Sequence, residues 1–259
     1  MFRSQGAARS HRQNRVLAGY LAFVGGLVNS AGFFLIGSFT SHVTGNVGRL
    51  ANDLATGDTH AALFAATMVA AFFGGAFAAS MILETNAVRV PYAYGAALLT
   101  EAGLLVVFLS LAGLTEAEHA VHARARDAEA AILCAAMGLQ NSLVTRLSGA
   151  VVRTTHLTGV VTDLGIEAAR WFRYWRAAAA DRVHVRLALG KKPAERPLPA
   201  KMALLGTIAT AFLAGAVAGA TLVSHLGART LLFPAAAVAL LGAYAFATGR
   251  RITAPEGRP

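Results

Sequence analysis

Charge is scarce in this sequence. Asp, Glu, Lys and Arg together make up 14% of the 259 residues, whereas about 25% is usual for a soluble domain. Hydrophobic residues make up 56%, and the mean hydropathy is positive. This composition excludes an ordinary soluble domain and predicts an integral membrane protein.

Cysteine and recognisable catalytic motifs are also lacking. Cys134 is the single cysteine and lies in an apolar run, which excludes an internal disulfide and a cysteine-cluster metal site. No further His, Cys or carboxylate stands at ligand spacing beside His42 or His156, so we expect no metal and no cofactor. The sequence has no Walker-type loop, nucleophile elbow, zinc-protease signature or dinucleotide fingerprint. We therefore expect no enzymatic activity.

Acidic residues are fewer than basic ones. The chain has 13 Asp and Glu against 23 Lys and Arg, a formal net charge of +10. Such an excess also suits nucleic-acid binding, but here the basic residues gather in particular segments between apolar runs. That distribution is typical of the positive-inside rule, by which Lys and Arg accumulate on the cytoplasmic side of a membrane. We expect a lipid bilayer as partner, no nucleic acid, and both termini in the cytoplasm.

Six apolar segments are candidates for membrane-spanning helices. They cover residues 16–37, 61–83, 91–113, 128–145, 202–223 and 231–248. About 20 apolar residues cross the hydrocarbon core of a bilayer. The fourth segment is short and is interrupted by the polar residues 140–142. We interpret the first segment as a retained span because it is longer than the core of a signal peptide and has no evident cleavage site.

Two short phrases occur twice, in the same order. GLVNS at residues 26–30 is followed by SHVTG at 41–45, and GLQNS at 138–142 is followed by THLTG at 155–159. In the same register, FFGGAFA at 72–78 matches FLAGAVA at 212–218. Two phrases in one order at similar spacing indicate an internal duplication of three spans.

An odd number of spans in each repeat has a geometric consequence. The two repeats enter the membrane from opposite sides, as in many secondary transporters. We therefore predict an all-α polytopic membrane protein of six transmembrane helices, arranged as two inverted three-helix repeats with broken polar segments. The predicted parts are a basic cytoplasmic arm (1–15), repeat 1 (16–113), an external loop (114–127), repeat 2 (128–248, with an amphipathic and basic cytoplasmic segment at 170–201) and a cytoplasmic tail (249–259).

The two His-x-Thr-Gly phrases are the segments that we expect to break the helices. They can meet only if both fold back toward the midplane, where irregular backbone is tolerated when it is buried in protein or lines a cavity. Glycine permits unusual dihedral angles, threonine can cap the following helix, and a helix N-terminus attracts anions. In the first phrase we expect Thr44 or Asn46 to cap a short helix over residues 47–54.

The candidate substrate-binding residues come from the repeated phrases. They are Asn29, Thr44, Gly45, Asn46, Asn141, Thr155, His156, Thr158 and Gly159. Helix capping alone also explains the Thr-Gly pairs. The two asparagines have a structural alternative as well, namely pairing with each other or with the broken backbone of the opposite repeat.

Three titratable residues are candidates for proton coupling. Glu101 lies near the middle of the third span, and His42 and His156 occupy the same position of the two phrases. Intramembrane carboxylates and neutral imidazoles can carry protons. A hydrogen-bonded structural role stays open for each of them.

The region after the second phrase combines acidic, basic and aromatic residues. Asp163 and Glu167 stand four apart, so one helix face can present both. Residues 170–176 alternate arginine with aromatic side chains. That pattern suits a helix at the membrane–water interface.

The residues at 25–39, 44–46, 138–142 and 153–159 resemble the YoaK family of bacterial six-span membrane proteins, whose function is uncharacterised. The resemblance covers roughly residues 17–248. It implies a six-span fold in a bacterial inner (cytoplasmic) membrane, and it implies no activity, substrate or cofactor. Family members often carry an acidic residue where this chain has Asn29.

Together these patterns predict a secondary transporter of a small polar or anionic solute, with its site between the repeats near the midplane. A channel of the same architecture is the first alternative. A non-transporting scaffold or sensor that uses the basic segment at 170–201 is the second. A homo-oligomer is compatible with all three.

Overall fold

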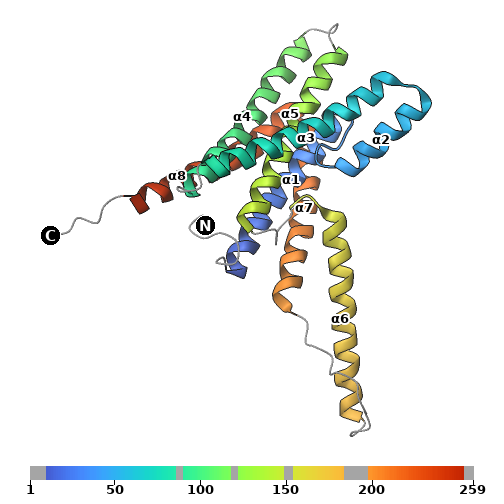
Figure 1. The fold of residues 1–259 in the computed structure, drawn as a ribbon, viewed down its shortest axis with the longest axis vertical. Helices are drawn as coiled ribbons and strands as arrows, with labels where there is room; N and C mark the ends of the chain where they lie inside the picture. Colours follow the sequence, from blue (N-terminus) through green and yellow to red (C-terminus); the bar gives the residue numbers. More distant parts are fainter. Residues whose placement is uncertain (1–9, 86–89, 118–121, 149–153, 184–197, 254–259) are drawn as a thin grey trace, which may run out of the picture.

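The computed structural model describes residues 10–85, 90–117, 122–148, 154–183 and 198–253, and these residues form helices joined by short segments, with no strand among them (Figure 1). The helices are α1 (His11–Ile36), α2 (Val43–Thr56), α3 (Thr59–Thr85), α4 (Val90–Ala117), α5 (His122–Ser148), α6 (Leu157–Val183), α7 (Pro199–Leu226), the 3₁₀-helix η3 (Gly227–Leu231) and α8 (Leu232–Thr253). The predicted all-α class is confirmed.

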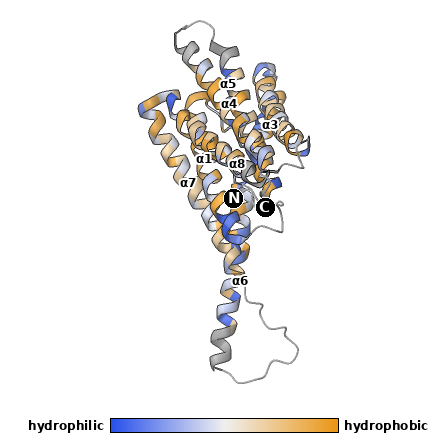
Figure 2. Cartoon of the chain, turned by 90° about the vertical axis from the view of Figure 1, so that its left-hand side faces the viewer, coloured by the Kyte–Doolittle hydropathy of each residue, from blue (hydrophilic) through white to orange (hydrophobic). Residues whose placement is uncertain are grey.

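Within the described residues, five segments are long and apolar enough to cross a membrane. They are His11–Ile36, Thr59–Thr85, Pro91–Ala112, Arg126–Ser148 and Pro199–Thr248. The last is 50 residues long and contains α7, η3 and most of α8. These segments are compatible with a membrane protein. In Figure 2 hydrophobic residues dominate α1, α4 and α7, whereas hydrophilic residues recur along α6.

Helix α1 begins earlier than its apolar stretch. Ser10 is its N-cap and forms a capping box with Gln13, so the helix starts within the segment predicted as an arm. It ends at Gly37, which adopts a left-handed conformation (φ 74°) and donates its N–H to the carbonyl of Phe33. Hydropathy locates the apolar stretch, whereas capping side chains decide where the helix begins and ends.

Two further helix bounds reach beyond the apolar runs of the sequence. Most of the predicted external loop at 114–127 is helical, because α4 continues to Ala117 and α5 begins at His122. Helix α5 also passes through its polar residues without interruption, and Asn141 Nδ2 donates to the carbonyl of Met137 at 2.8 Å. A polar side chain that bonds within its own helix satisfies itself and does not break that helix.

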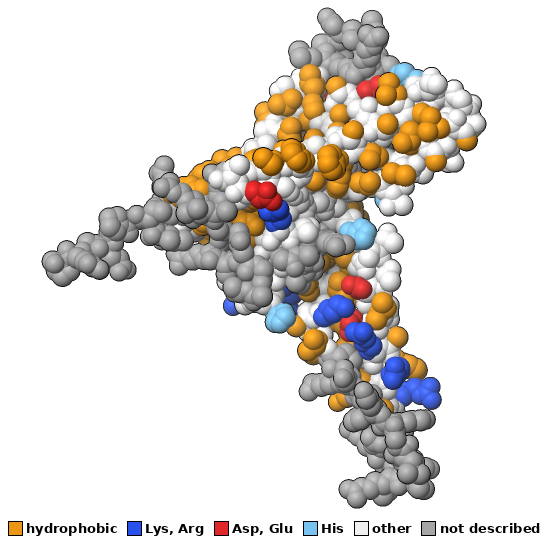
Figure 3. Space-filling model, in the orientation of Figure 1, with side chains coloured by type: hydrophobic (Ala, Val, Ile, Leu, Met, Phe, Trp, Pro, Cys, Tyr) orange, Lys and Arg blue, Asp and Glu red, His pale blue; other side chains and the backbone are white. Residues whose placement is uncertain are grey.

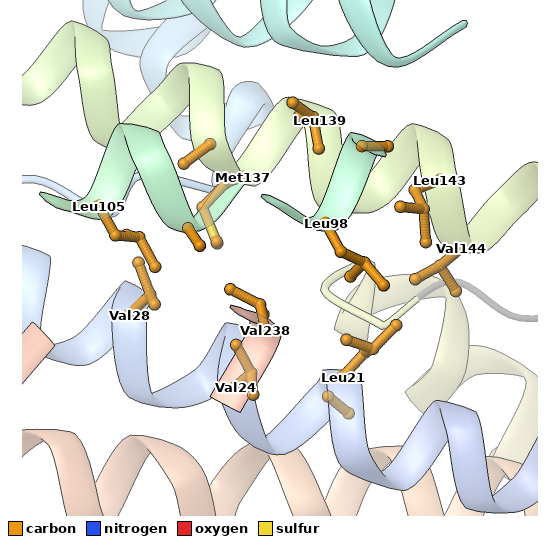
Figure 4. Packing of buried hydrophobic residues seen from close by; sticks show 14 of the residues in the cluster. Leu21, Val24, Val28, Leu98, Leu105, Met137, Leu139, Leu143, Val144 and Val238 are labelled. Carbon is orange, nitrogen blue, oxygen red and sulfur yellow. The ribbon is translucent and has the colours of Figure 1, made fainter. Parts of the chain in front are cut away.

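The helices pack in crossed pairs. α1 packs most extensively on α7, α3 on α5, and α4 on α8, while α2 lies beside α3 and α6 beside α7 (Figure 1). Apolar side chains of α1, α4, α5 and α8 meet at the centre (Figure 4): Leu21, Val24, Val28, Leu98, Leu105, Met137, Leu139, Leu143, Val144 and Val238. Each crossed pair joins one helix from the first half of the chain to one from the second half.

Glycines bring the backbones of α1 and α7 into contact. A Cβ on Gly26 would overlap the carbonyl oxygen of Phe212, and a Cβ on Gly215 would overlap that of Phe23. Close approach of small residues strengthens van der Waals packing between helices, which is the main attraction between them inside a membrane.

The same arrangement recurs between α3 and α5. A Cβ on Gly138 would overlap the carbonyl oxygen of Phe72, and a Cβ on Gly75 would overlap that of Ala135. Gly138 has the position in GLxNS that Gly26 has in α1, and Gly75 has the position in F-x-x-G that Gly215 has in α7. The carbonyls that they would overlap match as well, at Phe72 and Phe212 and at Ala135 and Phe23. Positions that match in sequence thus make matching contacts in the two pairs.

Candidate functional site

The first phrase is tied back to α1. Asn29 is buried, and its Oδ1 accepts hydrogen bonds from the backbone N–H of Ser41 at 3.0 Å and from the Ser41 hydroxyl at 2.9 Å. Asn29 lies about two helical turns, or about 10 Å, before the end of α1. The chain therefore turns back along α1 after Gly37, so that the phrase reaches the level of Asn29.

The second phrase is tied to α5 in the same way. Thr155 Oγ1 donates to Asn141 Oδ1 at 2.7 Å. Asn141 again lies about two turns before the end of its helix. Each asparagine therefore bonds to the phrase of its own half. Among the described residues, the hydrogen bonds of the two asparagines do not include pairing with each other or with the opposite half, the structural alternative considered for them.

Each histidine stands at the start of a helix. His42 is the N-cap of α2, and His156 directly precedes α6. The ring of His156 lies over Gly159, with Nδ1 2.8 Å from the place that a Cβ on Gly159 would take. The ring of His42 overlaps the corresponding place at Gly45. The glycine leaves room for the imidazole one turn into the helix.

This arrangement corrects two expectations. Gly45 and Gly159 are helical and do not have positive φ angles. Thr44 and Asn46 lie inside α2, which begins at Val43 and not near residue 47, so neither is its N-cap. The glycine of the His-x-Thr-Gly pattern allows the histidine ring to pack against a backbone that has no side chain. It does not serve an unusual dihedral angle.

The first turns of α2 and α6 present the same side chains outward. His42 and Thr44 are exposed in α2, and His156 and Thr158 are exposed in α6. Asn46 is buried. An exposed helix N-terminus carries a partial positive charge and unpaired backbone N–H groups, so each turn offers donors and imidazole to a small anion.

Both phrases contact the same helix. The Thr40 methyl group lies 3.0 Å from the place of a Cβ on Gly32, and the Thr155 methyl group lies 3.0 Å from the place of a Cβ on Gly25. These two glycines of α1 are about two turns, or about 10 Å, apart. Both halves of the chain therefore contact α1 at or next to their phrases, within about two turns of each other.

Some buried polar atoms next to the phrases or to these contacts lack a partner. Within the described parts of the chain, Thr40 Oγ1, Thr154 Oγ1 and Gln140 Oε1 are buried and have no hydrogen-bond partner. Gln140 Nε2 donates to the carbonyl of Leu21 at 2.6 Å, which places this side chain between α5 and α1. Buried polar groups are normally paired, so these two threonine hydroxyls and the glutamine carbonyl oxygen are exceptions among the described residues.

Sequence reasoning missed these three residues as site candidates. The signal was present for two of them, because the full repeated phrase includes the threonine before it: Thr40-Ser41-His42 and Thr154-Thr155-His156. Gln140 has no counterpart in the first half, where Val28 stands at its position. Its role follows only from the packing of α5 on α1.

Glu101 lies on α4, which carries neither phrase. It is fully buried in α4, and both carboxylate oxygens lack a hydrogen-bond partner among the described residues. Leu98 and Leu105 of the same helix face pack into the central apolar cluster (Figure 4).

An ion cluster joins α6 to α7. Glu167 is buried, and its Oε1 accepts from Lys201 Nζ at 3.0 Å and from Arg170 Nη1 at 2.8 Å. The hydrogen bond from Lys201 lowers the pKa of Glu167, and the positive charges of Lys201 and Arg170 add to the effect. The cluster thus fixes the middle of α6 against the start of α7.

Replacing Glu167 should change how stability depends on pH. Because the folded pKa is lowered, the carboxylate stabilises the fold above its unfolded pKa, and this contribution is lost as pH falls through the folded pKa. We expect Glu167→Gln to lower the thermal midpoint in detergent at neutral pH and to match the wild type in acid. Asp163→Asn, one turn earlier, is the control. A deficit of Glu167→Gln that persists in acid would contradict the assignment.

Comparison with known proteins identifies a family for this chain. No curated protein and no solved structure matches it. A family model described as a protein of unknown function (DUF1275) matches residues 17–244, from the second turn of α1 into α8. The match includes both phrases, the crossed glycines and Glu101. The chain therefore belongs to the DUF1275 family.

Proposed function

We propose that the protein is a secondary transporter of a small polar or anionic solute. The observation that carries the proposal is the contact of both halves with α1 at or next to their repeated phrases, together with the unpaired buried oxygens of Thr40, Thr154 and Gln140. Transporters commonly bind their solutes at helix breaks near the midplane, between inverted repeats.

The matched crossings support the inverted repeats. Gly26 and Gly138 occupy the same position of GLxNS, and each abuts a phenylalanine carbonyl on the helix that carries the other half's F-x-x-G. Exchange of the two halves therefore maps the α1–α7 pair onto the α5–α3 pair. With three spans in each half, the operation that exchanges the two halves is a twofold rotation about an axis in the membrane plane. This rotation gives the two halves opposite orientations across the membrane.

Six spans follow if the last apolar segment crosses twice. Its 50 residues are more than twice the roughly 20 that one crossing needs. Gly227, with φ 56°, opens the 3₁₀ turn that separates α7 from α8. α4 and α8 also meet reciprocally, since a Cβ on Gly95 would lie 3.1 Å from the carbonyl oxygen of Gly242 and a Cβ on Gly242 would lie 3.1 Å from that of Gly95.

In this transporter the two helix N-termini face one solute. The backbone N–H groups and threonine hydroxyls at the starts of α2 and α6 bind its negative or polar groups, with His42 and His156 as flanking donors. Asn29 and Asn141 hold the phrases in place through Ser41 and Thr155. Movement of one half against the other would open the site to each side in turn.

We place the protein in a bacterial inner membrane with both termini in the cytoplasm. The basic residues of the N-terminal arm and of the region from residue 146 to 201 then lie inside, as the positive-inside rule requires. Residues 1–9 of the predicted arm (1–15) and residues 184–197 of the predicted basic segment (170–201) lie outside the described residues.

The proposal predicts saturable currents in proteoliposomes. Concentration jumps of chloride, sulfate, inorganic phosphate, acetate and lactate would be applied on a solid-supported membrane. We expect at least one anion to give a transient, saturating current. His156→Ala and Thr158→Ala should each reduce its rate about tenfold, since a hydrogen bond to a charged group contributes about 1.5 kcal/mol or more.

Thr162→Ala is the matched control, because its hydroxyl bonds to the carbonyl of Thr158 within α6. It should leave the current unchanged. A steady current that does not saturate would favour the channel of the same architecture. Currents that no site substitution alters would refute the shared site, and no current with any anion would favour the scaffold or sensor.

A further inference from the structure

Exposed aromatic and basic side chains form a band on α6, on the C-terminal side of the ion cluster. Phe172, Arg173, Trp175 and Arg176 are all exposed, with Phe172 at 65% and Trp175 at 67%. Trp171 and Tyr174 turn to the less exposed side and contact each other edge to face. Figure 3 shows basic side chains following one another along this arm of the molecule, with hydrophobic ones between them. We call the four exposed residues the α6 band.

Two of the three arginines in this region remain available. Arg170 is engaged by Glu167 in the ion cluster. Among the described residues, Arg173 and Arg176 have no acidic side chain at ion-pairing distance. Arg176 lies over the ring of Phe172, with 6.0 Å from Cζ to the ring centroid. The band therefore combines an exposed aromatic surface with two guanidinium groups that no described acidic side chain pairs.

The position of the band along α6 sets its depth. The helix starts beside the repeated phrases, and residues 157–169 extend it by about 20 Å at 1.5 Å per residue. Half the hydrocarbon core of a bilayer is about 15 Å. Lys201 gives the same level independently, because it bonds to Glu167 and directly precedes the apolar part of α7. The band then stands where hydrocarbon meets headgroups.

We propose that the α6 band binds the headgroups of anionic phospholipids. Guanidinium groups pair with phosphate in a forked geometry, and tryptophan and phenylalanine with an adjacent polar neighbour favour the interface. A water-exposed ligand such as nucleic acid would account for the arginines but not for two large apolar rings at this depth. The inference rests on the proposed membrane placement and does not depend on transport.

The test uses the two tryptophans of the chain as reporters. Trp171→Phe leaves Trp175 as the single fluorophore. The substitution should be tolerated, since the indole N–H of Trp171 is buried without a partner among the described residues. The full chain is reconstituted into phosphatidylcholine–phosphatidylglycerol vesicles in which either one lipid or the other is brominated. Bromine quenches tryptophan at short range, so the ratio of the two quenching values reports which lipid lies beside Trp175.

We expect brominated phosphatidylglycerol to quench Trp175 more than its share of the bilayer predicts. Replacing Arg173 and Arg176 by glutamine should lower the preference for the anionic lipid by roughly fivefold per arginine, and added salt should lower it too. Arg229→Gln, next to α8, is the control and should keep the preference. The double variant should retain any solute current, so a failed lipid test and a failed transport test remain distinguishable.

Equal quenching by both lipids, or a preference that survives Arg173→Gln with Arg176→Gln, would overturn the proposal. Absence of quenching by either lipid would place the band in water and overturn it as well. In that case, retention of an RNA oligonucleotide by the detergent-solubilised wild type, and its loss in the double variant, would assign the band to nucleic acid.

Discussion

Gly75→Ala should unfold the protein at a markedly lower temperature than the wild type. The added methyl group would overlap the carbonyl of Ala135, and a backbone carbonyl cannot move aside by rotating a side chain. Overpacking of this kind costs about 1–3 kcal/mol, and the upper part of that range is expected here because two helices must separate. Thermal unfolding in detergent, followed by size-exclusion chromatography of the remaining folded fraction, measures the effect.

Gly74→Ala is the matched control for that experiment. Gly74 is the adjacent residue of the same helix, and a Cβ there would meet nothing within 4 Å. Alanine is about 1 kcal/mol better than glycine inside a helix, so this variant should be as stable as the wild type or slightly more so. Equal loss of stability in both variants would show that the crossing of α3 and α5 is not what makes Gly75 sensitive.

Glu101→Gln should uncouple solute movement from a proton gradient while leaving the protein folded. Glutamine keeps the shape of the side chain but cannot gain or lose a proton, so a step that requires protonation of Glu101 stops. We expect the current driven by an imposed proton gradient to fall at least about tenfold, the scale of effect when a proton-transfer group is lost. The measurement is the same concentration jump, made with and without the gradient.

A second substitution at Glu101 separates this role from a structural one. Glu101→Leu removes a buried carboxyl group that lacks a partner among the described residues, so it should raise the thermal midpoint and also abolish the dependence on the gradient. Currents of Glu101→Gln that still respond to the gradient would assign proton coupling to His42, His156 or another group.

The helical class and much of the span pattern were predictable because hydropathy alone reports them. The first four predicted spans coincide with four of the apolar helices of the structure. The bonds of Asn29 and Asn141 were anticipated only as a need for partners, because a sequence states that a buried amide must be paired and not what pairs with it. The choice of Ser41 and Thr155 depends on how tightly the chain turns after α1 and α5.

Other features could not be predicted from the sequence. The glycine of His-x-Thr-Gly suggested a broken backbone, but it leaves room for an imidazole ring, and the two roles have the same sequence signature. The polar residues 140–142 interrupt the apolar run, yet α5 continues through them and Asn141 is satisfied within the helix. The closest neighbours of Gly26 and Gly138 lie far away in the chain, at Phe212 and Phe72. The packing of all the helices together decides which helix faces lined by small residues meet.

The crossed pairing of the helices has a consequence for how the chain is made. α1 leaves the ribosome first, but its main partner α7 begins at Pro199. Until then the glycine face around Gly26 has no backbone to meet, and the first half cannot complete its packing alone. Synthesis proceeds from the N-terminus, so the final docking waits for most of the polypeptide. A chain interrupted before α7 would leave the α7-facing surface of α1 uncovered.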